Sequence, residues 1–211
     1  MRHRMMAAVA AALLLSASAL GAAAQPIPAR RDTTLAWDDG EYVFGEWIMG
    51  VSGMQLAVMF QAPEWSSFVT EIEIFAIFEE DPAVPFLAHV WKPTDDSPPL
   101  PGNPAMEPVY VGWGSPGASW IPVVLPEPVN IEDPAAFPER RFFVGMEWLA
   151  HMDPHVGMDM REPVYQMGWE WNFYEWEHLT LGDAMVRAVV GDSTATSVEP
   201  RSWGTVKALY R

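Results

Sequence analysis

The densest group of candidate metal ligands in this 211-residue chain lies at residues 151–160, which read HMDPHVGMDM. His151, Asp153 and His155 carry groups that bind zinc or copper, and the neighbouring methionine sulfurs suit cuprous ion. Pro154 excludes the regular helix that would align the two histidines, so the ligands would have to converge in a loop. The pattern favours another interpretation, a polar turn between two strands whose last two methionines fill the core. Periplasmic metal binding is kept as an alternative function.

Aspartates in turn-like segments are candidate ligands for calcium, which prefers hard oxygen donors. Asp38 and Asp39 precede Gly40, and further aspartates in such segments are Asp81, Asp95 and Asp96. No spaced Asp-x-Asp-x-Asp-Gly loop is present. The pattern favours a tight turn in which Gly40 adopts a positive φ. A structural calcium ion is the cofactor that we expect if the domain holds one.

Four aromatic residues near the C-terminal end are candidates for ligand binding: Trp169, Trp171, Tyr174 and Trp176. Trp169 and Trp171 alternate, so they share one face of a strand. If exposed and coplanar, such rings would stack on the apolar faces of sugars. The other interpretation is that they fill the space between two sheets. The sequence leaves both open, because only the exposure of the rings separates them.

Sequence motifs of common enzyme classes are missing. The chain has no cysteine, no Gly-x-Ser-x-Gly elbow and no phosphate-binding glycine loop, which excludes thiol, elbow-serine and nucleotide chemistry of the known kinds. Paired carboxylates such as Glu79/Glu80 and Glu170/Glu177 could serve glycoside hydrolysis, but 28 acidic residues produce such pairs by chance. We therefore predict a protein that is not an enzyme.

Short alternating segments, punctuated by Pro and Gly, predict an all-β domain over residues 35–191. In residues 68–78, for example, Ile72 and Ile74 fall on one face and Glu71 and Glu73 on the other. The expected strands lie at residues 54–60, 68–78, 85–91, 109–113, 119–125, 141–149, 164–171 and 183–190. Eight or nine strands at this spacing favour a single antiparallel β-sandwich.

The N-terminus has the pattern of a secretory signal peptide. Arg2 and Arg4 precede an uncharged apolar stretch, and the small residues 21–24 offer a cleavage site before Gln25, as signal peptidase requires. We expect residues 1–24 to be removed and residues 25–34 to form a mobile leader. No later segment is apolar over the length of a membrane span.

The charge of the mature chain limits its partners. Cleavage removes two of the 12 basic residues, so the formal net charge changes from −16 to −18. Such a surface repels phosphate backbones and anionic lipid, which argues against nucleic acid and membrane surfaces. Neutral glycans and cations are compatible with it.

The C-terminal end differs from the rest of the chain. Residues 192–200 are a polar linker by composition, and residues 201–211 (RSWGTVKALYR) form a basic tail with an apolar stripe. One interpretation is a short amphipathic appendage that docks on the domain. The other is a sorting or attachment tail.

Several strand and turn phrases lie at residues 37–40, 88–92, 95–102, 120–125, 142–148, 176–179 and 182–190. Together they resemble the β-sandwich modules of large secreted or surface proteins of Bacteroidetes-like bacteria. Those modules are found beside flagellar-hook-type Ig repeats or type IX sorting domains. The resemblance covers about residues 35–190 and implies a jelly-roll-like, non-catalytic module, although no Ig-like or sorting domain follows here.

Together these features predict a secreted, non-catalytic module with a binding or structural role at the cell surface or outside the cell. The signal peptide does not distinguish the periplasm from the surface or the medium. The expected partner is a glycan or another surface protein. The first alternative is a carbohydrate-binding or carbohydrate-active module.

Overall fold

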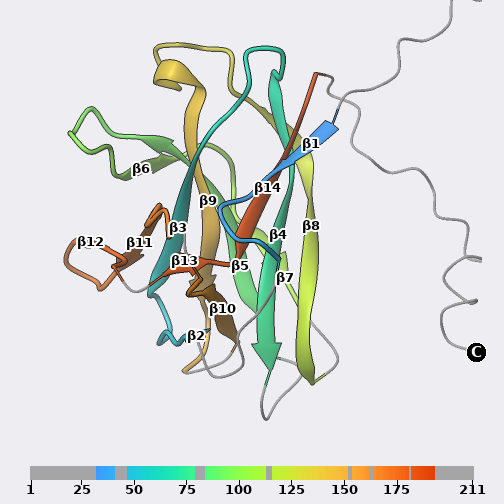
Figure 1. Cartoon of the computed structure of the whole chain (residues 1–211), viewed down its shortest axis with the longest axis vertical. Coiled ribbons are helices and arrows are strands. Elements are labelled where there is room, and N and C mark those ends of the chain that lie inside the picture. Colours follow the sequence, from blue (N-terminus) through green and yellow to red (C-terminus); the bar gives the residue numbers. More distant parts are fainter. Residues whose placement is uncertain are drawn as a thin grey trace, which may run out of the picture.

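The structure, a computed structural model, describes residues 32–40, 47–78, 84–112, 116–151, 154–161, 164–180 and 182–192. These residues form two seven-stranded antiparallel sheets that pack as a β-sandwich (Figure 1), so the predicted all-β class is confirmed. The one helical element among them is a 3-10 turn, η1 (Pro138–Arg140). Within these ranges no helix has the length and apolar character needed to cross a membrane.

Sheet 1 has the order β1–β14–β4–β10–β13, with β8 paired to β4 and β2 paired to β10. Its strands are β1 (Asp32–Leu35), β2 (Trp47–Ile48), β4 (Phe68–Phe78), β8 (Gly117–Asn130), β10 (His155–Asp159), β13 (Asp183–Ala184) and β14 (Val186–Gly191). The longest pair is β4 with β8, which share ten paired positions; β4 lies inside the sheet and β8 at its edge.

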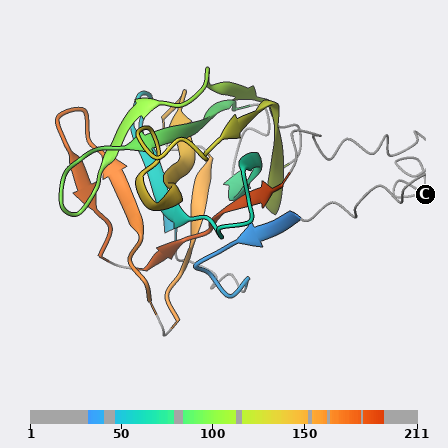
Figure 2. The same cartoon turned by 90° about the horizontal axis from the view of Figure 1, so that it is seen from above.

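Sheet 2 has the order β12–β11–β3–β9–β5–β6, with β7 paired to β5. Its strands are β3 (Gln55–Gln61), β5 (Phe86–Pro93), β6 (Pro101–Pro104), β7 (Val109–Val111), β9 (Arg141–Trp148), β11 (Gly168–Trp171) and β12 (Trp176–His178). The hairpin of β11 and β12 (orange, left in Figure 2) lies at one side of the sandwich.

The core lies between the sheets, because each central strand turns one alternating set of apolar side chains inward. On β4 the glutamates at 71 and 73 point away from this core, while the isoleucines at 72 and 74 are fully buried. Ten apolar residues at alternating positions of the expected strands are all buried in this core: Leu56, Val58, Phe60, Ile72, Ile74, Ala88, Val90, Val144, Val186 and Val190.

Some strands lie where alternation gave no signal. β10 occupies part of the stretch expected to be a turn, and all five of its residues are buried, so no polar face marks it in the sequence. β1 begins at Asp32 and pairs with β14, which places the last three residues of the expected leader in sheet 1. Its residues DTTL are exposed or half-buried. The strand lies at the edge of the sheet and is held mainly by its backbone hydrogen bonds to β14, so its sequence carries no apolar alternation.

Candidate functional site

The outward face of sheet 2 carries small side chains in its middle and large side chains on either side. One row of paired residues crosses it from β11 over β3 and β9 to β5: Trp169, Ala57, Gly145 and His89. The residues that flank Ala57 lie in the core, so by alternation this row faces outward. A side chain at Gly145 would collide with the backbone of Leu56. The row therefore has large side chains at both ends and almost no side-chain volume between them.

Aromatic side chains cover this small middle and form a second hydrophobic cluster. Its buried members are Ala57, Trp91, Phe143 and Trp169, and Trp176 packs against them. The ring centroids of Trp91 on β5 and Trp176 on β12 are 5.9 Å apart, although β11, β3 and β9 separate those strands. In a flat sheet the two strands would lie about 19 Å apart. Sheet 2 therefore curls, with its concave side outward.

The tip of the β11–β12 hairpin presents aromatic side chains to solvent. Asn172 Oδ1 accepts hydrogen bonds from the backbone N–H groups of Tyr174 and Glu175, each 3.1 Å long, which fixes an Asx turn. Phe173 has a φ of 78°, a conformation that bulky residues rarely adopt, and its ring lies against Gly53. Tyr174 is 88% exposed. Such local strain concentrates at functional sites.

Behind the tip, two half-buried tryptophans form an angled surface. Trp171 and Trp176 are paired across the hairpin, with ring centroids 5.7 Å apart and planes inclined by 53°. Because the two ring planes are inclined to each other, a ligand could contact both ring faces at once. Trp171 is also paired with Gln55 on β3, so a planar amide lies beside the aromatic walls.

Polar side chains continue from Gln55 across the concave face. Gln55 Nε2 donates a 3.1 Å hydrogen bond to Glu147 Oε2 on β9. The same oxygen lies 3.3 Å from His89 Nε2 on β5, outside hydrogen-bonding geometry. The His89 ring stacks on Trp91 at 4.7 Å, with an interplanar angle of 4°. Amide, carboxylate and imidazole thus adjoin the aromatic cluster.

His89 is a buried histidine that stays neutral. It is 4% exposed, and neither ring nitrogen has a hydrogen-bond partner among the described residues. Burial lowers its pKa from the ordinary 6.5 to about 4, because the imidazolium form loses its hydration there.

This burial predicts a pH dependence of stability. Unfolded His89 takes up a proton near pH 6.5, whereas the folded protein resists protonation until about pH 4. The free energy of unfolding should therefore fall as the pH drops through this window. The share due to His89 is about 2 kcal/mol between pH 7 and pH 5. The His89→Gln variant should lack this pH-dependent share, which urea unfolding of the wild type and the variant at pH 7 and pH 5 measures. An unchanged pH dependence in the variant would contradict the burial argument.

The structure thus separates the four aromatic residues singled out in the sequence. Trp169 is 3% exposed, and its ring centroid lies 5.3 Å from that of Phe143. It is buried in the aromatic cluster on the outward face of sheet 2 and not in the core between the sheets. Trp171 and Trp176 are half-buried, and Tyr174 stands in solvent. Three of the four can therefore reach a ligand.

The glutamate pair of the hairpin lies on its other face. Glu170 and Glu177 are paired directly across β11 and β12, and Glu170 alternates with the tryptophans of β11. Burial raises the pKa of Glu170, and the negative charge of Glu177 raises it further. This pair does not join the aromatic surface.

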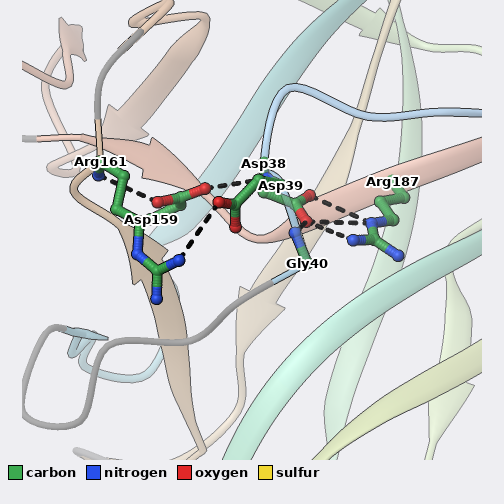
Figure 3. Close-up of polar contacts among 6 residues, drawn as sticks. All are labelled: Asp38, Asp39, Gly40, Asp159, Arg161 and Arg187. Atoms are coloured by element: carbon green, nitrogen blue, oxygen red, sulfur yellow. Dashed lines mark hydrogen bonds and ion pairs between the residues drawn. The ribbon is translucent and has the colours of Figure 1, made fainter.

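The aspartates at 38 and 39 form ion pairs with arginines (Figure 3). The Asp38 side chain is fully buried, and both of its oxygens lie 3.1 Å from Arg187 Nε. Gly40 donates its backbone N–H to Asp38 Oδ1 at 2.9 Å and has a φ of 85°, as the turn interpretation expected. Asp39 is exposed, and its Oδ2 lies 3.5 Å from Arg161.

The candidate metal ligands do not form a cluster in the described ranges, where no group of three or more His, Asp or Glu side chains is placed to hold an ion. His155 is buried and stacks on Trp47 at 5.4 Å, while His151 is exposed in the loop after β9. Asp153 and Asp81 lie outside the described residues. Asp95 and Asp96 are exposed in the loop after β5.

Sequence reasoning missed the polar part of the concave face. His89 and Trp91 alternate on β5, which was a signal that they share a face, and the outward positions of β3 and β9 add Gln55 and Glu147. The strand order that brings them beside Trp171 could not be read from the chain.

Comparisons with known proteins found no matching family model, no matching curated protein and no matching solved structure.

Proposed function

We propose that this protein is an exported, non-catalytic β-sandwich module that binds neutral glycans through the aromatic hairpin of β11 and β12. The observation that carries the proposal is the hairpin tip, where Tyr174 is 88% exposed in a turn held by Asn172. An exposed aromatic side chain in a fixed turn loses little conformational entropy on binding.

The chemistry beside the tip supports a sugar ligand. The walls of Trp171 and Trp176 offer apolar ring faces for sugar C–H groups. Glu147 and Gln55 supply acceptors and donors for hydroxyl groups on the same concave face. The formal charge of −16 for the whole chain disfavours anionic polysaccharides and favours neutral ones.

The strand order supports a jelly-roll connection of the two sheets, which we propose as the finer description of the fold. Part of sheet 1 runs β1–β14–β4–β8 and part of sheet 2 runs β3–β9–β5–β7. Successive long strands β3, β4, β5, β8, β9 and β14 alternate between the sheets. A jelly roll consists of two such sheets joined by Greek-key connections.

Export is the part of the proposal that rests on the sequence alone. The basic, apolar and small-residue regions of residues 1–24 support secretion, and these residues lie outside the described structure. We place the mature protein in the periplasm, on the cell surface or in the medium, with no nucleic acid among its partners.

Removing the exposed rings should weaken glycan binding. Trp171→Ala and Tyr174→Ala are each expected to raise the Kd for a neutral oligosaccharide by about tenfold or more, as for aromatic residues that dominate interfaces. A glycan array identifies the oligosaccharide and titration calorimetry measures the Kd. Trp65→Ala is the matched control, because Trp65 is an exposed tryptophan in the turn between β3 and β4, away from the hairpin.

Cooperative unfolding of each variant must first show that the fold is intact. The proposal fails if no neutral glycan binds, or if Trp65→Ala weakens binding as much as the hairpin variants do. Capture of a surface protein that depends on Tyr174, without glycan binding, would replace the glycan by a protein ligand at the same tip.

A further inference from the structure

We propose that the basic C-terminal segment 201–211 of this chain docks into an acidic hollow at one end of the sandwich. The hollow is formed by two adjoining cavities of about 690 and 670 Å³. Both are lined by Lys92, Asp133 and Ala136. This surface is separate from the aromatic hairpin, and the proposal does not depend on glycan binding.

The lining combines negative charge with apolar surface. Its four carboxylates are Asp95, Glu107, Glu127 and Asp133, against the single ammonium group of Lys92. Its apolar part includes Met106, Pro126, Pro128, Val129 and Phe137. An occupant that fits this hollow carries positive charge and several apolar side chains.

The segment 201–211 has that composition. It contains Arg201, Lys207 and Arg211 and no acidic residue. It also contains Trp203, Val206, Leu209 and Tyr210. A helix of this length is marginal in water, so such a segment needs a surface in order to stay ordered. The basic residues of the segment complement the carboxylates of the hollow, and its apolar residues complement the apolar part of the lining.

The described chain ends beside the hollow. Ser67 donates its backbone N–H to Gly191 at the end of β14, and its own carbonyl accepts the N–H of Ile131. Gly191 is therefore two strand spacings, about 10 Å, from the end of β8, and Asn130, the last residue of β8, lines the hollow. In Figure 1, β14 ends at the top of the sandwich, where the loop carrying η1 also lies.

The linker is long enough for docking within one molecule. Residues 193–200 can span about 26 Å when extended, more than the distance to the rim. Docking on the same molecule is also favoured by the high effective concentration of a short tether. The occupant is therefore the tail of the same chain.

Disulfide trapping tests this contact directly, because the chain has no cysteine of its own. In the full-length mature protein, Met106→Cys with Val206→Cys should form an intramolecular disulfide at least ten times faster than Trp65→Cys with Val206→Cys. Trp65 is a stringent control, since it is exposed and lies two residues from Ser67, close to the chain exit, but outside the hollow. Glu107→Cys replaces Met106→Cys if the latter impairs folding.

Charge reversal gives a second, independent measurement. Glu107→Lys with Glu127→Lys should slow the Met106–Val206 cross-link at least tenfold, and high salt should slow the unreversed protein similarly. Equal rates for the Met106 and Trp65 pairs would show a tail that samples the surface at random and would overturn the proposal. Cross-linking that rises with protein concentration and yields dimers would also overturn it, because the tail would then dock on another copy.

Discussion

Replacing Arg187 with methionine is expected to lower the free energy of unfolding by about 3–5 kcal/mol, the typical cost of leaving a buried charge without its partner. The Asp38 carboxylate is fully buried and is held by Arg187 through both of its oxygens. The guanidinium also lies 3.9 Å from the centre of the Trp120 ring, a cation–π contact. Without Arg187, the hydrogen bond that the Gly40 backbone N–H donates to Asp38 Oδ1 remains, but it does not neutralise the carboxylate.

Two further variants separate the buried charge from the loss of packing. Asp38→Asn with Arg187→Met removes both charges and should recover a large part of the loss, since well-packed neutral replacements of buried pairs are often tolerated. Arg161→Met breaks the exposed contact to Asp39 and should cost less than about 1 kcal/mol. Urea unfolding of the four proteins measures these differences. A cost for Arg187→Met no larger than that for Arg161→Met would refute the structural role of the pair.

This ion pair also shows what the sequence could not predict. The turn at residues 38–40 was recognisable, because an aspartate pair before glycine is turn chemistry. Its partner Arg187 lies 149 residues away. It faces Asp38 because β1, which leads into the turn, pairs with β14 in sheet 1. Candidate calcium ligands and ion-pair carboxylates have the same local sequence, and the long-range partner decides between them.

Strands with one face buried were predictable, and strands covered on both faces or held at an edge were not. β4 alternates glutamate with isoleucine, and its bounds agree with the expected segment at both ends. All five residues of β10 are buried, including its histidine, glycine and aspartate, and the Trp47 ring covers His155; the period of two therefore disappears. The sequence HVGMD therefore read as a connection.

The aromatic site was predictable in part for a related reason. Alternation placed Trp169 and Trp171 on one face, which the pairing with β3 confirms. Their different burial depends on the curl of sheet 2 and on the contact between Trp91 and Trp176, 85 positions apart in the chain. Local patterning cannot report a curvature that brings two distant strands together.

Val58→Asp is expected to cost more than about 4 kcal/mol and to unfold much of the protein at ambient temperature, because it buries a charge with no partner. Val58 is buried in the middle of β3, paired with Val144 on one side and Gly168 on the other. Val124→Asp is the matched control: that valine is exposed on β8 and pairs with Glu71. Even with this like-charge neighbour it should cost less than about 1 kcal/mol. Thermal and urea unfolding compare the two, and similar losses would mean that the inward phase of β3 is misassigned.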